Sequence, residues 1–293
     1  MVFNAFAKLV KERIPEYLLQ YDIEDVRLEP VTKNNGVVCT GLIICVRGEN
    51  LSPNIYLEYF YMMHKRGKDM DEILRAIQAE YESARGQLCA EQYQTMDENV
   101  VRENLFLKLI NRERNKEMLE GCPYIPFHDL AISFRYLVKH DEEGIASAIL
   151  REKEMELWNL TTDEIFRLAR ENTMRLFPMR LAKLNDMIPI GLTELAECPD
   201  MYVLTNRQQI NGATCMLYRD VLEQFAGQVE SSFYILPSSI HEVLLLPDCC
   251  GMDADYLRKS VREINACAVA DMDYLSDNVY YYDRKDKTVR VCN

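Results

Sequence analysis

The sequence predicts an α+β protein with antiparallel sheets flanked by helices. Strand-like runs follow one another before each helix-like segment, which is the order expected of this class. Three predicted helices also begin alike, in KDMDEILRAI, LTTDEIFRLA and GMDADYLRKS, as repeated strand–strand–helix units would. Capping preferences alone place acidic and hydroxyl residues at most helix starts, so the repeat stays open beside that simpler explanation.

A polar stretch at residues 86–99, GQLCAEQYQTMDEN, divides the chain. At 293 residues the chain is long enough for one large domain or two ordinary ones. We expect an N-terminal α+β domain at residues 1–95 and a C-terminal α/β domain at residues 96–293, the second with a helical lead-in.

The N-terminal domain begins with a predicted amphipathic helix at Asn4–Leu19, which Pro15 bends or ends. Asn34-Asn35-Gly36 is a good signal for a hairpin turn between two strand-like runs. Apolar residues recur every four positions in Asp71–Arg85, which predicts a helix there. The predicted strands are Val26–Val31, Val37–Val46 and Asn54–Met63.

The C-terminal domain begins with a long predicted helix at Val100–Leu119, stopped by Gly121 and Pro123. Thr161 and Glu164 fit a capping box at the start of a later helix. The next strands are expected at Asp129–Val138, Gly144–Leu150 and Met201–Asn206, followed by a helix at Cys215–Val229.

The last part of the chain combines one more helix with a hairpin. Asp253 is the predicted N-cap of a helix that runs to Asn265. Its inward-facing residues are predicted to be Leu257, Val261 and Ile264. VYYYDR and TVRV then form a hairpin around residues 285–287, and the strand period turns Tyr281 away from its two tyrosine neighbours.

The composition is that of an ordinary soluble protein, with 48% apolar and 28% charged residues. The net charge of −13 disfavours a nonspecific nucleic-acid binder, because such proteins need clustered Lys and Arg. The acidity is spread over both halves of the chain, which favours a soluble acidic surface over an acidic nucleic-acid mimic.

The targeting features favour a cytoplasmic protein. Charged residues interrupt the N-terminal apolar segment, so no signal peptide is expected. No apolar run approaches the ~20 residues of a membrane span. The ten cysteines are therefore expected to be reduced thiols, mostly buried, rather than disulfides.

No complete metal or cofactor motif occurs in the sequence. His241-Glu242 begins like HExxH, but residue 245 is leucine, and neither CxxC nor a Gly-rich nucleotide loop appears. The vicinal pair Cys249-Cys250 could ligate a soft metal, although two ordinary thiols are favoured. We predict no cofactor and no metal, with Cys249 and Cys250 as the candidate ligands should a metal bind.

The stretch FYILPSSIHEVLLLPD, which starts at Phe233, holds the candidate catalytic residues. On a strand, Ser239 and His241 would face the same side, and Glu242 or a distant carboxylate could orient the histidine. The favoured interpretation is structural, because Leu236–Ser239 suits a type I turn with proline at its second position. The hairpin arms would then be Phe233–Leu236 and Glu242–Leu246, the second buried because of its three leucines.

Several stretches between about Leu109 and Asp283 resemble an uncharacterised bacterial family, a domain of unknown function frequent in gut Firmicutes. They are LINRERNKEMLEGCP, FHDLAISFRYLV, ELWNLTTDEIFRLARENT, MYVLTNRQQINGATCMLY, FYILPSSIHEVLLLP, VREIN and LSDNVYYYD, with NIYLEYFY extending the match toward the N-terminus. The order of elements is also similar to a second uncharacterised Firmicute family. The resemblance implies a bacterial cytosolic protein, and no activity, cofactor or catalytic residue comes with it.

The lack of a complete catalytic motif favours a non-enzymatic cytosolic binding or accessory protein, with another protein as its partner. The alternative is a hydrolase that uses Ser239 and His241, oriented by Glu242 or a distant carboxylate. The third is an acidic nucleic-acid mimic, which needs one continuous negative stripe. No membrane partner is expected, and nucleic-acid binding is disfavoured.

Overall fold

The computed structural model divides the chain into two compact units. The first comprises residues 1–33 and 37–96, and the second comprises residues 34–36 and 97–293. The predicted domain boundary between residues 95 and 96 lies outside the described residues. The structure describes residues 1–49, 52–90, 98–141, 144–187, 200–218, 220–248 and 251–292.

The protein is α+β, as predicted, and each strand pairing in its sheets is antiparallel. The described strands form sheets of three, four and six strands. The three similar helix starts of the sequence belong to α3 (Met70–Ala90), α7 (Thr162–Leu176) and α9 (Ala254–Ala268), which follow strands of three sheets that differ in strand number and order.

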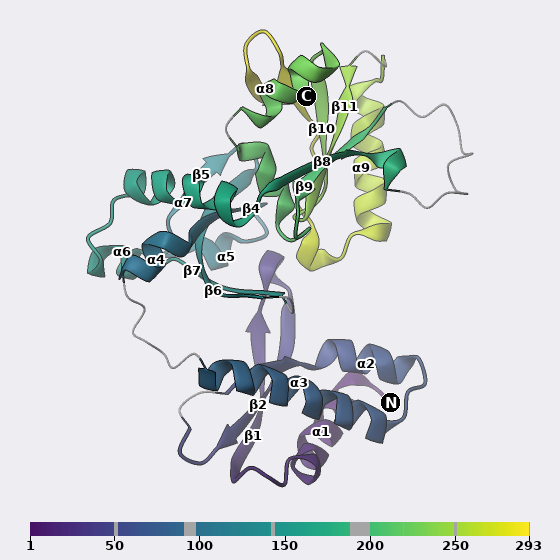
Figure 1. The fold of residues 1–293 in the computed structure, drawn as a ribbon. Helices are drawn as coiled ribbons and strands as arrows, with labels where there is room; N and C mark the ends of the chain where they lie inside the picture. Colours follow the sequence, from purple (N-terminus) through teal and green to yellow (C-terminus); the bar gives the residue numbers. More distant parts are fainter. Residues whose placement is uncertain are drawn as a thin grey trace. The chain divides into compact units, whose positions relative to one another are not determined.

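Over its described residues, the first unit combines a three-stranded sheet with helices (Figure 1). Its elements are α1 (Phe3–Arg13), β1 (Ile23–Thr32), β2 (Val38–Val46), β3 (Asn54–Tyr56), α2 (Leu57–Lys65) and α3 (Met70–Ala90). The strand order is β1-β2-β3. As predicted, Pro15 ends α1, because the chain tightens there into a 3-10 turn, Ile14–Tyr17.

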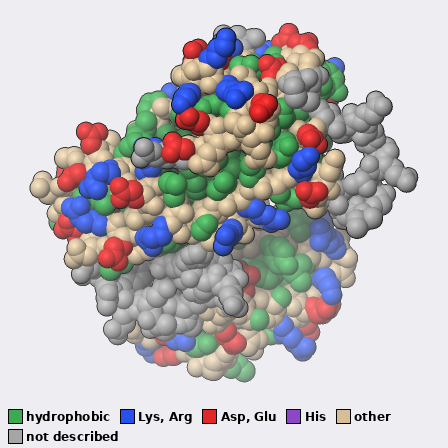
Figure 2. All heavy atoms as spheres, turned by 45° about the horizontal axis from the view of Figure 1, so that its top comes forward, with side chains coloured by type: hydrophobic (Ala, Val, Ile, Leu, Met, Phe, Trp, Pro, Cys, Tyr) green, Lys and Arg blue, Asp and Glu red, His purple; other side chains and the backbone are tan. Residues whose placement is uncertain are grey.

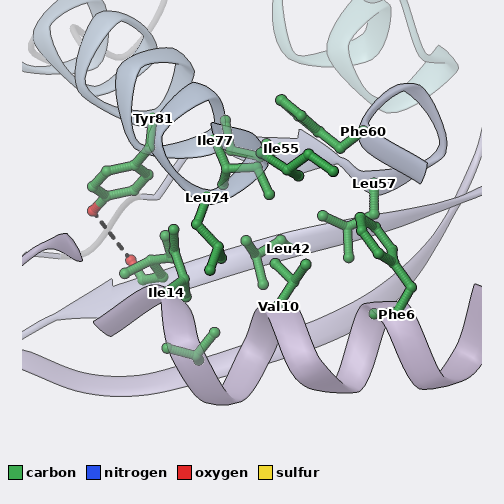
Figure 3. Packing of buried hydrophobic residues seen from close by; sticks show 14 of the residues in the cluster. Phe6, Val10, Ile14, Leu42, Ile55, Leu57, Phe60, Leu74, Ile77 and Tyr81 are labelled. Atoms are coloured by element: carbon green, nitrogen blue, oxygen red, sulfur yellow. Dashed lines mark hydrogen bonds between the residues drawn. The ribbon is translucent and has the colours of Figure 1, made fainter. Parts of the chain in front are cut away.

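The core of the first unit lies between its helices and its sheet (Figure 3). The labelled side chains come from the helices and from β2 and β3, and they are Phe6, Val10, Ile14, Leu42, Ile55, Leu57, Phe60, Leu74, Ile77 and Tyr81. Tyr81 is the largest of them, and its hydroxyl donates to the carbonyl of Ile44 at 3.5 Å. Burial raises the pKa of Tyr81 to about 12, so this phenol stays protonated and apolar in character.

The predicted strand Asn54–Met63 is wrong after its third residue. The chain leaves β3 at Tyr56 and continues as the helix α2. Leu57 and Phe60 are buried, whereas Tyr59 is 66% exposed, so burial follows a helical period and not a period of two. Aromatic and apolar residues are abundant on both faces here, and that abundance hid the period in the sequence.

The second unit begins with a four-stranded sheet. Its elements are α4 (Glu98–Asn104), β4 (Leu105–Asn111), α5 (Lys116–Leu119), β5 (Tyr124–Phe127), β6 (Leu130–Asp141), β7 (Gly144–Ile149), α6 (Glu152–Leu157) and α7 (Thr162–Leu176). β6 pairs with β4 along one edge, and β5 and β7 share the other edge. The capping box predicted at Thr161 and Glu164 is confirmed at the start of α7.

The single long helix predicted at Val100–Leu119 is wrong, because the chain is strand between Leu105 and Asn111. Almost every residue of β4 is buried, on both faces of the sheet. A strand buried on both faces is a continuous apolar run, and such a run cannot be distinguished from a buried helix by periodicity.

The free edge of β4 is closed by two threonine side chains. The backbone N–H of Leu107 donates to Thr173 Oγ1 at 2.9 Å, and that of Leu109 donates to Thr214 Oγ1 at 3.1 Å. Both hydroxyls are buried, so they replace the neighbouring strand that these amides would otherwise need.

A six-stranded sheet forms the rest of the second unit. Its elements are β8 (Met179–Lys183), β9 (Tyr202–Asn206), α8 (Val221–Val229), β10 (Phe233–Ser239), β11 (Glu242–Pro247), α9 (Ala254–Ala268), β12 (Tyr280–Asp283) and β13 (Thr288–Val291). The strand order is β13-β12-β10-β11-β9-β8. Helices cover both faces (Figure 1), since Leu257 of α9 packs with Leu236, while Phe225 of α8 contacts Phe233 on the opposite face.

Two predictions in this part need correction. Cys215–Val229 is not one helix but a 3-10 turn, Gly212–Leu217, followed by α8 after Asp220, whose φ is +63°. Ile264 was expected to face inward from α9, yet it is 51% exposed, and Asn265 is buried in its place. The C-terminal hairpin is confirmed, with Tyr281 facing away from its buried neighbours.

Within the described ranges, no helix has both the length and the apolar character that crossing a membrane requires.

Candidate functional site

The hairpin β10–β11 turns later than predicted. Pro237 lies in the strand opposite Val243, and the turn is made by Ile240 and His241. The partner strand β12 reaches only as far as Ile235 along β10, so the N–H that Pro237 lacks is not needed for pairing on that side. The predicted two-armed hairpin is confirmed, whereas its proposed turn at Leu236–Ser239 is wrong.

The serine hydroxyls at this turn serve the turn itself. Ser239 Oγ accepts a hydrogen bond from the backbone N–H of His241 at 3.0 Å. Ser238 Oγ donates to Glu242 Oε1 at 3.2 Å. These contacts are the local side-chain bonds that stabilise tight turns, and they occupy Glu242 as well.

The imidazole of His241 is held at both nitrogens. Nδ1 accepts from the backbone N–H of Asn211 at 3.3 Å, and Nε2 lies 3.2 Å from Asp273 Oδ1. An amide donor at Nδ1 requires a lone pair there, so the ring proton is on Nε2 and points to Asp273. The group that orients the ring is therefore a distant carboxylate, Asp273, and not Glu242.

Within the described part of the chain, no hydrogen bond joins Ser239 to the ring of His241. A serine nucleophile needs the free lone pair of a histidine that an acid orients. Here the acid is present at Nε2, but the lone pair at Nδ1 is taken by a backbone amide. The hairpin tip thus holds a His–Asp pair without the third group.

Asp273 belongs to a loop whose backbone is anchored at every carbonyl from Asp271 to Ser276, and we call these residues the anchored loop. One carbonyl accepts from a backbone amide, that of Ile240, and the others accept from asparagine side chains. The asparagines are Asn34 and Asn35, which belong to the second unit, together with Asn111 and Asn265.

Buried polar residues hold the anchored loop on the side that faces the protein interior. Asn111 donates to the carbonyl of Leu275 at 2.9 Å, and the Ser276 hydroxyl donates to Asp129 Oδ2 at 2.7 Å. The second oxygen of Asp129 accepts from Tyr280 at 2.7 Å. Ser276 is fully buried, and burial together with the Asp129 charge raises the pKa of Tyr280. A network with its members satisfied in this way holds one backbone conformation.

A pocket of about 400 Å³ lies between the anchored loop and the C-terminal half of α9. We call it the α9 pocket, and its polar lining consists of Arg114, Arg262, Asn265, Asp271, Tyr274 and Asp277. The Arg114 guanidinium lies over the Tyr274 ring, 3.6 Å from its centroid, which is cation–π geometry. Burial raises the pKa of Tyr274, and the nearby Asp277 carboxylate raises it further.

One half-buried basic group, Lys108, lies outside this pocket. Lys108 of β4 pairs across the sheet with Ser133, two residues from Arg135 on the same face. Burial lowers the pKa of Lys108 to about 7, and the Arg135 guanidinium lowers it further, while Asp273 opposes both. Its amine therefore loses its charge near neutral pH.

The remaining candidates give no site. Cys249 and Cys250, the predicted metal candidates, lie outside the described residues. Among the residues that are described, no group of three or more His, Cys, Asp or Glu side chains is arranged to hold a metal ion. A second pocket, of about 410 Å³, is lined by Tyr234, Tyr281, Asp248 and Arg290, with Tyr281 donating to Asp248 at 2.8 Å.

Sequence reasoning missed Arg114, Arg262 and Tyr274. They come from separate segments, and neither their residue types nor their spacing matches a known motif. One signal was available. The stretches LINRERN, FHDLA, VREIN and LSDN, which carry the family resemblance, supply Asn111, Asp129, Asn265 and Ser276, so these stretches converge around one loop.

A family model described as a family of unknown function covers residues 3–284 of the chain. The chain matches no curated protein and no solved structure.

Proposed function

The chain belongs to the family of unknown function DUF5688, and on that premise we propose that it is a non-enzymatic binding or accessory protein of the bacterial cytoplasm. Its partner is another protein. The observation that carries this proposal is the anchored loop, in which each carbonyl from Asp271 to Ser276 accepts a hydrogen bond.

A loop fixed in this way is suited to recognition. Ordering a surface on binding costs free energy, and a surface that is already ordered avoids much of that cost. The anchored loop holds Asp271 and Tyr274 beside a pocket, and Asp271 is 88% exposed. The surrounding polar residues serve the backbone of the loop, which leaves its exposed side chains available to a partner.

Affinity purification tests this proposal. The tagged protein is expressed in the bacterial cell that encodes it, and captured proteins are identified by mass spectrometry against a tag-only control. We expect one protein to be recovered reproducibly, and native mass spectrometry of the purified mixture to show a complex of fixed stoichiometry. The absence of any such complex would contradict the proposal.

The hydrolase with Ser239 and His241 is the second candidate, and the 3.2 Å contact between His241 Nε2 and Asp273 Oδ1 favours it. If Ser239 were an active nucleophile, the wild-type protein would react with a fluorophosphonate. Ser239→Ala and His241→Ala would then each abolish labelling. Because Nδ1 is occupied by Asn211, we expect no labelling of the wild-type protein. Labelling that His241→Ala removes would instead support the hydrolase.

Nucleic-acid mimicry, the third candidate, needs one continuous acidic surface. On the face drawn in Figure 2, acidic and basic side chains are interspersed and alternate with apolar ones. That face offers no stripe of negative charge, so the proposal of a protein partner is preferred.

A further inference from the structure

We propose that the α9 pocket binds a carboxylate group, with Arg262 as the residue that pairs with it. The inference rests on the proposed binding function and names the site and the chemistry through which a partner is recognised. It is carried by an arginine without a partner, by the charges around it, and by the shape of the pocket.

Arg262 is a pocket cation that has no ion-pair partner in the part of the chain that the structure describes. Among the described residues, its guanidinium has neither a hydrogen bond nor an ion pair, although it lines the pocket from α9. Arginine carries donors in a planar fork that matches a carboxylate bidentately. An exposed guanidinium beside a preformed pocket is therefore positioned to receive such a group.

The other charges of the pocket already have partners. Arg114 stacks on Tyr274, and its Nη1 lies 3.7 Å from Asp271 Oδ1. Asp277 accepts from Asn265 Nδ2 at 2.8 Å, a neutral donor that uses one of its oxygens. Among the described residues, Arg262 is therefore the pocket cation without a carboxylate at ion-pair distance. The nearby Asp271 and Asp277 carboxylates repel a doubly charged phosphate more strongly than a monoanion, so the pocket suits a carboxylate better than a phosphate.

The wall of the pocket suits the hydrocarbon part of a small acid. Ala266, Val269 and Ala270 line the pocket between Arg262 and the anchored loop, and they bring little bulk. The Arg114 side chain is 42% exposed, and the guanidinium face that points away from Tyr274 can stack with a peptide plane or a ring. A Glu or Asp side chain on an extended peptide has both the short apolar stem and the planar group.

The pocket is also built to keep its form. Asn265 is buried at 9% exposure and donates to the carbonyl of Ser276 as well as to Asp277. One amide in the lining of the pocket thus joins α9 to the anchored loop. Because both walls are fixed, little ordering is required when a ligand enters.

Titration of the purified full chain tests the proposal. Binding is followed by NMR chemical shifts of the Tyr274 ring and the Asn265 side-chain amide. The probes are N-acetylated, C-amidated hexapeptides with a central Glu, their Gln counterparts, sodium glutarate, sodium benzoate and inorganic phosphate. We expect the Glu peptides or the free acids to shift both signals, and the Gln peptides to leave them unchanged.

Arg262→Gln is expected to weaken carboxylate binding about tenfold or more, because it removes a charge-assisted contact. Arg170→Gln is the matched control. Arg170 is an exposed arginine on α7, away from the pocket lining, and its replacement should leave binding unchanged. Peptide binding without binding of the free acids would identify a protein segment as the source of the carboxylate, and the reverse would identify a small acid.

Three outcomes would overturn the proposal. They are equal binding of Glu and Gln peptides, unchanged affinity in Arg262→Gln, and tighter binding of phosphate than of any carboxylate. If the partner protein is captured equally by the wild type and by Arg262→Gln, the pocket is not its contact and the binding function still stands. If carboxylates bind but no partner is captured, the pocket stands and the proposed function fails.

Discussion

Gly212 lies where the tip of the β10–β11 hairpin packs closely against β9, and no side chain fits at this position. A Cβ at this position would come within 2.2 Å of Thr205 Oγ1 and 2.4 Å of the His241 carbonyl. These two groups are themselves bonded, because Thr205 Oγ1 donates to the His241 carbonyl at 2.7 Å. The glycine is therefore required by close packing around a polar contact.

Gly212→Ala is expected to lower the free energy of unfolding by about 1–3 kcal/mol, because the added methyl group overpacks this contact. The control is Gly227→Ala in α8, where an added Cβ would meet nothing within 4 Å. That change should raise the free energy of unfolding by about 0.5–1 kcal/mol, since alanine favours a helix interior. Urea denaturation, followed by circular dichroism, measures the free energy of unfolding of both variants. If Gly212→Ala were as stable as the wild type, the turn around Gly212 would be able to shift and accommodate the methyl group.

Lys108 makes stability depend on pH in the neutral to alkaline range. Its folded-state pKa of about 7 lies below the unfolded value of roughly 10.4. Between these values the unfolded chain binds more protons than the folded one, so stability rises with pH across this window. Below pH 7 the partly desolvated charge has its full destabilising effect.

Lys108→Met should therefore raise the free energy of unfolding by on the order of 1–3 kcal/mol at pH 6, and the gain should shrink toward pH 10. The exposed Lys116→Met serves as control and should stay within about 0.5 kcal/mol of the wild type at pH 6. Denaturant titrations at several pH values measure the effect. A gain that does not change with pH would mean that Lys108 is solvated.

Among the elements, β4 depends on the two threonines that close its edge. Thr173→Val and Thr214→Val keep the side-chain shape but leave the amides of Leu107 and Leu109 without an acceptor. Each change should lower the free energy of unfolding by about 1–3 kcal/mol. Hydrogen exchange at the corresponding amide should also become faster.

Thr288→Val, on the exposed side of β13, is the control for these two variants. It should change the free energy of unfolding by no more than about 0.5 kcal/mol. If Thr173→Val and Thr214→Val behaved like this control, water would be satisfying the edge amides in place of the hydroxyls.

Most elements could be predicted from the sequence where one pattern dominated. The capping box at Thr161, the Asn-Gly turn with φ of +60° at Asn35 and +70° at Gly36, and the amphipathic α3 followed local rules. The failures at α2 and β4 lie in runs that are apolar on every side, where the period carries no information. At Pro237 the decisive fact was the length of a partner strand, which no local pattern contains.

The site was predictable only in part. Strand geometry indicates whether Ser239 and His241 share a face. The ring contacts of His241, however, come from Asn211 and Asp273, each about thirty positions away in the chain. The pocket arginines are likewise brought together by tertiary packing. Asn265 illustrates the point, because the apolar period of α9 favoured the burial of Ile264, while a polar network buried the asparagine next to it.

At the scale of the whole molecule, the two units have separate hydrophobic cores. The first is built around residues such as Leu42, and the second contains the sheet with Leu245, both fully buried. The chain has a single tryptophan, Trp158, which lies in the second unit. Its fluorescence therefore reports on the second unit alone.

Leu42→Ala should destabilise the first unit by about 2–5 kcal/mol and leave the Trp158 unfolding transition in place. Leu245→Ala should shift that transition by a similar free energy. Fluorescence and far-ultraviolet circular dichroism, recorded on the same denaturant series, separate the two effects. A shift of the Trp158 transition by Leu42→Ala would show that the units unfold together.

The anchored loop is held mainly through its backbone carbonyls, and this affects which of its residues can vary among relatives. Because asparagine amides hold carbonyls that every residue type possesses, exchanging Asp271, Met272 or Tyr274 would leave the grip intact. The side chains of these residues can therefore be replaced while the hydrogen bonds that hold the loop backbone remain. Changes of recognition among relatives should thus concentrate in this short segment, while the asparagines that hold it persist.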